Sequence, residues 1–170
     1  MTKSLPLRLE NLIFPVVSVR AEVPKESQKR GDFLLKHMNV EFVFDYEDSG
    51  KRAAAALKVE TKKDCFEQLE DVPSYSIEVE GVAYFDVMRP EDTDDRATYF
   101  RKFAAVSALI GAVREQISMT TARGPWGSMY MPILDVNSII GPLPPKPDQP
   151  SAAVPIPRKR AAKAVEASKS

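Results

Sequence analysis

The stretch YSIEVEGVAYFDVM, residues 75–88, is typical of a long β-strand whose two sides differ. Every second residue from Tyr75 onward is apolar or glycine, as expected where one face of a strand lies against a core. The other side is polar in its first half and apolar in its second half, at Val82, Tyr84 and Met88. We therefore expect something to cover the second half of that other side.

Three further segments complete a sheet. Apolar and polar residues alternate over 38–46 and again over 53–61, and the turn-forming residues Asp48-Ser49-Gly50 join the two runs, which predicts an antiparallel hairpin. The segment NLIFPVVSVR, residues 11–20, is apolar on both sides and contains Pro15, which cannot donate to a central ladder. It is predicted to be a strand at a sheet edge or at a seam between subunits.

A long helix follows the strands. Apolar side chains recur at spacings of four and three from Tyr99 to Ile117, which makes one continuous stripe. Thr93 or Asp94 is expected to cap its start, and Arg123-Gly124-Pro125 to end it. Strands followed by one long helix predict an α+β fold in which the helix lies across one face of the sheet.

The composition divides the chain into two parts. The chain has 170 residues and a formal net charge of zero. However, residues 142–170 hold half of its 14 prolines, no aromatic residue and an excess of basic side chains. Such a segment buries too little apolar surface to offset its ordering entropy. We predict a folded domain at 1–141 and a disordered, Pro-rich basic tail at 142–170.

Several functional classes find little support in the sequence. The single Cys65 excludes an intramolecular disulfide, and no stretch is long and apolar enough to span a bilayer, so we expect a soluble cytoplasmic protein. His37 is the only imidazole and is expected at a loop or strand edge. Cys65 is expected to be an inert thiol in a surface-like acidic connection. Without a nucleophile–base pair or a phosphate-binding loop, we expect no enzyme, cofactor or metal.

The segment after the helix is unusual. Residues 124–136, GPWGSMYMPILDV, contain the only Trp, two Met and two Pro, with one charge. Two interpretations remain open: the segment packs over its own sheet and closes the core, or it presents an adaptable apolar surface to a partner chain.

These features resemble the SecB-type export chaperones. The resemblance rests on the strand SIEVEGVAYFDV, the acidic connection and long helix after it, and the exit segment from Ala122 to Val136, and it covers about residues 10–140. It implies a four-stranded antiparallel sheet packed against one long helix, with sheets joined edge to edge in dimers and dimers joined through helices into tetramers. A second helix near the C-terminal end of the domain, usual in the family, is expected to be shortened or missing.

The resemblance also implies a function. SecB-like proteins are ATP-independent holdases that keep unfolded, export-competent polypeptides in hydrophobic grooves, and some relatives serve antitoxins. The client-binding residues implied here are a wall and a floor: Trp126, Met129, Tyr130 and Met131 for the wall, and Phe42, Phe44 and Tyr46 for the floor. The Phe42 side of its strand is equally compatible with burial under the helix.

A second hypothesis is an adaptor on the same fold that binds one specific folded partner. The basic tail would then contact nucleic acid or an acidic partner.

Overall fold

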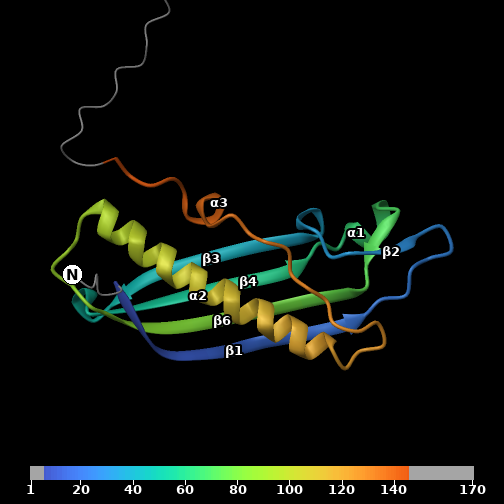
Figure 1. The fold of residues 1–170 in the computed structure, drawn as a ribbon, viewed down its shortest axis with the longest axis horizontal. Coiled ribbons are helices and arrows are strands. Elements are labelled where there is room, and N and C mark those ends of the chain that lie inside the picture. The colour runs from blue at the N-terminus through green and yellow to red at the C-terminus, as the bar shows by residue number, and fades with distance from the viewer. Residues whose placement is uncertain (1–5, 146–170) are drawn as a thin grey trace, which may run out of the picture.

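A computed structural model describes residues 6–145 and contains a four-stranded antiparallel sheet packed against one long helix (Figure 1). The strand order is β1 (Leu7–Ala21), β6 (Tyr75–Val87), β4 (Arg52–Thr61) and β3 (Met38–Glu47). The α+β fold predicted from the sequence is confirmed. The segment that contains Pro15 does form an edge strand, because β1 pairs only with β6.

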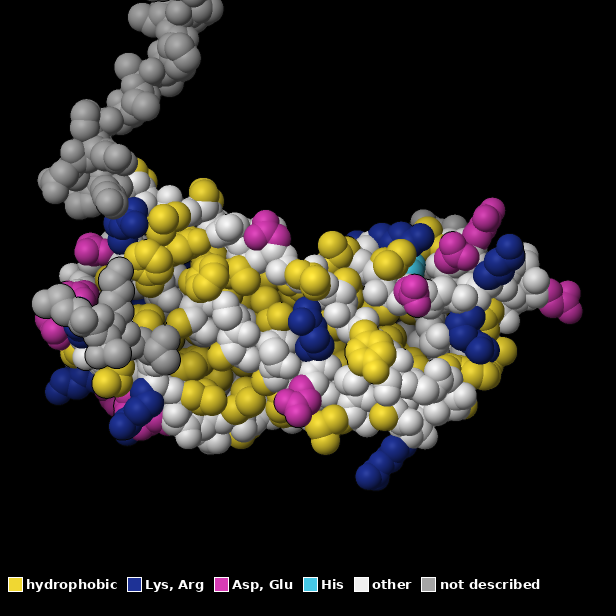
Figure 2. Space-filling model, in the orientation of Figure 1, with side chains coloured by type: hydrophobic (Ala, Val, Ile, Leu, Met, Phe, Trp, Pro, Cys, Tyr) yellow, Lys and Arg dark blue, Asp and Glu magenta, His cyan; other side chains and the backbone are white. Residues whose placement is uncertain are grey.

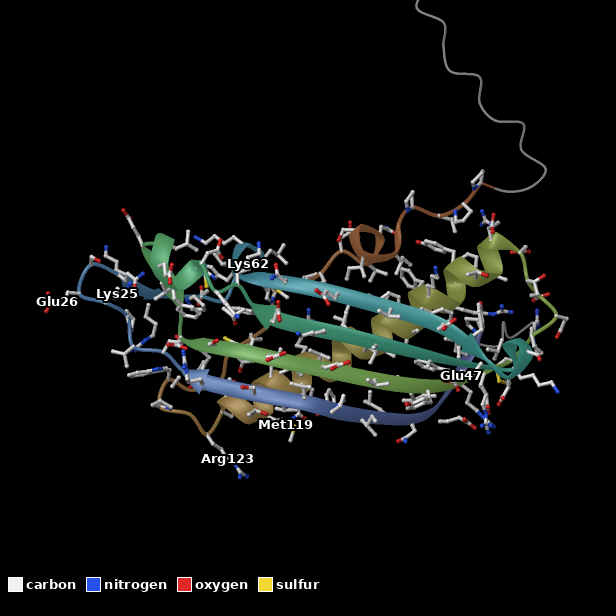
Figure 3. The ribbon with its side chains drawn as sticks, turned by 180° about the vertical axis from the view of Figure 1, so that it is seen from behind. Lys25, Glu26, Glu47, Lys62, Met119 and Arg123 are labelled. Atoms are coloured by element: carbon white, nitrogen blue, oxygen red, sulfur yellow. The ribbon has the colours of Figure 1, made fainter. Side chains whose placement is uncertain are left out.

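Strand alternation assigns the two faces of the sheet. On the inner face the side chains of Leu57, Val79 and Phe85 are buried. Their neighbours along the chain, such as Lys58 and Tyr84, point to the other face, here called the open face. Figure 3 views the sheet from this side, with the long helix behind it.

The helix α2 (Asp95–Thr121) covers the inner face and contacts β6, β4 and β1. The carboxylate of Asp94 accepts a hydrogen bond from the Ala97 N–H at 2.6 Å, so Asp94 is the N-cap. Val106, Leu109 and Val113 are fully buried and form the centre of the core. The stripe predicted by spacing therefore faces the sheet from Val106 to Ile117, but its earlier member Phe103 is 41% exposed.

A small second layer closes one end of the molecule. The short strands β2 (Lys29–Gly31) and β5 (Asp71–Pro73) pair in parallel. Around them lie the helix α1 (Cys65–Gln68) and the 3₁₀ helix η1 (Leu35–His37), while a second 3₁₀ turn, η2 (Asp48–Gly50), joins β3 to β4 at the opposite end.

This end of the molecule corrects one expectation and adds to another. His37 lies in η1 directly before β3, next to the strand as expected, but its side chain is fully buried, and its Nδ1 accepts the N–H of Leu34 at 3.1 Å. Cys65 is 2% exposed and not on the surface, and burial raises the pKa of its thiol to about 11. The connections that contain them are covered by β2 and β5, whose pairing joins segments 40 residues apart. The high thiol pKa agrees with the expectation of an unreactive cysteine.

After α2 the chain runs back over the sheet to the short helix α3 (Val136–Ile140), which contacts both α2 and β3. This five-residue helix is the shortened second helix that the sequence allowed. The predicted tail lies outside the described residues from position 146 onward, and residues 141–145 form no helix or strand.

Candidate polypeptide-binding surface

The segment after α2 divides its large side chains between core and solvent. Met129 and Met131 are 6% and 4% exposed and pack into the core, whereas Trp126 is 38% and Tyr130 is 70% exposed. The backbone N–H of Met129 donates to Oγ1 of Thr121 at 2.8 Å, which holds the segment against the helix end. Each of the two earlier interpretations thus describes part of this segment.

Tyr75, on the inner face of β6, anchors the turn that follows α2. Its hydroxyl oxygen accepts the N–H of Trp126 at 3.0 Å and lies 3.0 Å from the carbonyl oxygen of Gly127. A Cβ atom at Gly124 would lie 2.5 Å from the same hydroxyl oxygen, so this close approach requires glycine. The turn is therefore built on the sheet and carries Trp126 to the surface.

A hollow of about 260 Å³ opens beside this turn. Its apolar lining comes from three parts of the chain: Phe33, Tyr75, Trp126, Met129 and Tyr130. That volume accommodates a large apolar side chain. Three of the four predicted wall residues line it, and Met131 does not.

A positive charge stands at the rim of the hollow. The guanidinium of Arg30, in β2, lies 3.5 Å from the centre of the Trp126 ring, a cation–π contact. The contact fixes the orientation of the indole while leaving part of it exposed. A polypeptide that reaches Trp126 therefore also meets Arg30.

The predicted floor residues lie elsewhere. Phe42, Phe44 and Tyr46 are half-buried on the inner face of β3 and pack against the core. The Tyr46 hydroxyl oxygen accepts a hydrogen bond from Nη1 of the buried Arg101 at 3.1 Å. None of the three lines the hollow at Trp126. The structure thus brings most of the wall together but keeps the floor residues in a separate place, next to α3.

Further exposed apolar side chains lie on the helix side of the molecule, and one of them, Phe103, belongs to the stripe that the spacing predicted to be buried. Ile133 is 83% exposed, and Phe100 and Phe103, on α2, are 45% and 41% exposed. The hydroxyl of Tyr99 donates to Oδ1 of Asn137 at 2.6 Å and ties α2 to α3 nearby. Figure 2 shows hydrophobic side chains gathered on this side of the molecule. Phe100 lies outside the predicted stripe, and its i, i+3 spacing from Phe103 was the available signal for an exposed pair.

We call these exposed residues the apolar track: Phe100, Phe103, Trp126, Tyr130 and Ile133.

A metal site or a membrane-spanning helix would require other features of the described residues. No group of three or more His, Cys, Asp or Glu side chains in residues 6–145 is placed to hold a metal ion. Among the helices of this part of the chain, none combines the length and apolar character needed to cross a membrane. A second hollow, of about 950 Å³, lies on the open face and is lined mainly by polar and charged side chains.

No model of a known protein family matches this chain, and no curated protein matches it in sequence. Among solved structures it is similar to a SecB-like chaperone of Mycobacterium tuberculosis in complex with a ChAD peptide from an antitoxin. The TM-score is 0.47 and the identity 16%, over 76% of this chain and 91% of that chain. It is also similar to a protein of unknown function from Streptococcus agalactiae, with a TM-score of 0.45 and 11% identity, over 76% and 99% of the two chains.

Proposed function

We propose that this protein is an ATP-independent holdase that binds unfolded polypeptides along the apolar track. The observation that carries the proposal is the exposure of Tyr130 and Ile133, at 70% and 83%, in a segment whose methionines anchor it to the core. A segment that only closed the core would bury its aromatic side chains. Here the anchoring residues and the exposed residues are different ones.

The mode of binding follows from the kind of surface. Each apolar side chain of a client that leaves water contributes about 25 cal/mol per Å² of buried area, with little dependence on sequence. Many small contacts along an extended chain therefore favour breadth over specificity. In this proposal the hollow at Trp126 takes one large apolar side chain, and the neighbouring surface takes the residues that follow it.

The wall and floor keep distinct roles in this proposal. Trp126 and Tyr130 contact the client directly, and Met129 forms the base of the hollow. Met131 supports the segment from the core. Phe42, Phe44 and Tyr46 extend the surface where a client displaces the short helix α3 from β3.

The setting of this activity is also a proposal. By its resemblance to SecB-type chaperones, we place the protein in the cytoplasm as a homo-oligomer, either a dimer or a tetramer. Its clients would be export-competent chains or an antitoxin, and an export motor is a further candidate partner. The edge strand β1 is available for edge-to-edge pairing of sheets, since only one of its edges is paired in the described chain.

The test is light scattering from a chemically denatured client that is diluted into buffer without nucleotide. We expect the protein to suppress aggregation near one oligomer per client, and Trp126→Ser/Tyr130→Ser to reduce the suppression at least fivefold. The matched control is Tyr84→Ser/Met88→Ser, which removes an exposed aromatic residue and an exposed apolar residue from the open face. That control should retain full activity.

Two results would contradict the proposal. Equal activity of the Trp126/Tyr130 variant and the control would move client binding away from the track. No suppression by the well-folded protein would favour an adaptor that recognises one folded partner. Circular dichroism of both variants shows whether they are folded.

A further inference from the structure

The open face of the sheet is organised in rows, because pairing aligns residues across all four strands. One row is Ile13, Val82, Ala56 and Val43. Val43 is 64% exposed and Ile13 is 43% exposed, and Tyr84 in the adjacent row is 36% exposed. We call the residues Ile13, Val43, Val82 and Tyr84 the apolar band. In the described chain nothing covers it, although the sequence predicts a cover.

The next rows along the strands are acidic. Glu80 and Glu41 flank Lys58 in one row, and Glu78 and Glu60 lie beside each other in the row after it. The ammonium of Lys58 pairs with Glu60 at 3.0 Å and Glu78 at 2.9 Å. It makes no ion pair with Glu41 or Glu80 within residues 6–145. Arg20, Lys62 and Lys63 line the same hollow as Glu60 and Glu78, whereas Glu41 and Glu80 form no ion pair within the described chain. We call these four glutamates the acidic rows.

The described chain ends beside the start of α2, in the layer that covers the inner face of the sheet. Nη1 of Arg96, in the first turn of α2, donates to the carbonyl oxygen of Pro144 at 2.7 Å, which ties the chain to the start of the helix. The start of α2 lies at the end of the sheet where Glu47 is labelled in Figure 3. Moving along the open face from that end, a charged row of Arg8, Asp86, Arg52 and Glu47 comes first. The apolar band follows it, and the acidic rows come after the band.

The remaining 25 residues, 146–170, contain an apolar segment followed by a basic one, which matches the order of the apolar band and the acidic rows. Residues 152–157, AAVPIP, are apolar, and residues 158–160, RKR, are basic, with Lys163 further on. Thirteen extended residues, 146–158, span up to about 43 Å. The rows of Tyr84 and Glu80 are only about 13 Å apart along the strand, and the four strands are together about 19 Å wide. The segment is therefore long enough to pass around the β3 edge and reach both regions.

We propose that residues 146–170 dock on the open face of the same chain. The apolar part covers the apolar band, and Arg158, Lys159 and Arg160 contact the acidic rows. Charge complementarity and the matching order of apolar and charged chemistry select this occupant over a second copy of the sheet, whose open face would bring like charges together. The docking surface is separate from the apolar track, so this proposal does not depend on the holdase activity.

The test is zero-length carbodiimide coupling on the full chain, which joins a lysine amine to a carboxylate in contact with it. Unlabelled and ¹⁵N-labelled chains are mixed in equal amounts, refolded together, coupled and analysed by mass spectrometry. We expect Lys159 and Lys163 to couple to Glu41, Glu60, Glu78 or Glu80 within one chain. The yield should fall at least fivefold in 0.5 M NaCl, where screening shortens the range of the attraction.

A matched pair of variants separates docking from chance contact. Val43→Lys places a positive charge in the apolar band and should lower the coupling yield at least threefold. Val23→Lys changes a valine of similar exposure, 81% against 64%, that lies outside the open face and should leave the yield unchanged. An absence of coupling between tail and sheet, or an equal loss in both variants, would overturn the proposal. A mixed-isotope share near one half of the coupled products, which is the value for random pairing between chains in an equal mixture, would assign the surface to a second copy.

Discussion

The two faces of the sheet are made by alternate residues of the same strands, and they differ in burial, charge and packing. On β4, Leu57 is fully buried beneath α2, whereas Lys58 beside it forms ion pairs on the open face. On β6, Tyr75 anchors the turn after the helix, whereas Tyr84 is exposed. A strand with a period of two can thus support a core with one side and present a docking surface with the other.

This difference between the two faces indicates which interactions each face supports. The inner face carries the helix and the segment that exposes Trp126 and Tyr130, so the candidate client surface is built on a rigid core. The open face carries no layer within residues 6–145 and keeps its charges in solvent. Changes on the inner face should therefore alter stability, and changes on the open face should alter interactions.

The largest expected difference is in the stability lost when an aliphatic residue is truncated on one face or on the other. Leu57→Ala should lower the free energy of unfolding by about 3 kcal/mol, because it leaves a cavity under α2 in a fully buried site. Val43→Ala on the open face should cost less than about 0.5 kcal/mol, since Val43 is largely exposed. Urea unfolding of both variants measures the difference. Equal losses would mean that the open face is also packed in solution.

A smaller difference in stability is expected between phenylalanine substitutions at two tyrosines of β6. Tyr75→Phe removes the acceptor for the Trp126 N–H and should cost about 1–2 kcal/mol. It should also make the segment after α2 more sensitive to limited proteolysis. Tyr84→Phe serves as the control, and its unfolding midpoint and cleavage rate should match those of the unchanged protein. If Tyr75→Phe leaves the proteolysis pattern unchanged, Tyr75 does not anchor the segment after α2.

The smallest effect concerns pH and the buried His37. Burial and the nearby Lys36 charge lower the pKa of His37 below its usual value of 6.5, although the Asp71 and Asp32 segments act in the opposite direction. The unfolded chain therefore binds the proton more readily, so stability should decrease as pH falls from 7 through 6.5 toward 5. One such proton changes stability by at most about 1.4 kcal/mol per pH unit.

His37→Gln keeps an acceptor for the Leu34 N–H and should remove this pH dependence from urea midpoints measured between pH 7 and 5. Glu60, on the open face, does not interfere in this range. The hydrogen bond from Lys58 lowers its pKa below the usual 4.5, so it titrates only at lower pH. A midpoint that falls equally in the unchanged protein and the variant would assign the effect to other groups.

Much of this architecture could be predicted from local pattern alone. Alternation over residues 75–88 and 38–61 indicated which side chains face the core, because side chains of a strand point to opposite faces in turn. The spacing of apolar residues from Tyr99 to Ile117 indicated the helix and, from Val106 onward, its buried side. Pro15 indicated an edge strand. These features depend on neighbours in the chain, so the sequence by itself determined them.

Other features depend on contacts between distant segments, and only the tertiary structure decided them. His37 and Cys65 are buried because β2 and β5 pair across 40 residues. Met129 points inward and Tyr130 outward because the Thr121 hydroxyl and Tyr75 fix the turn after α2. The separation of Phe42, Phe44 and Tyr46 from the Trp126 hollow arises from the path of α2 over β6 and β4. Composition revealed an unusual segment, but the packing of remote elements determined which of its side chains remain available to a partner.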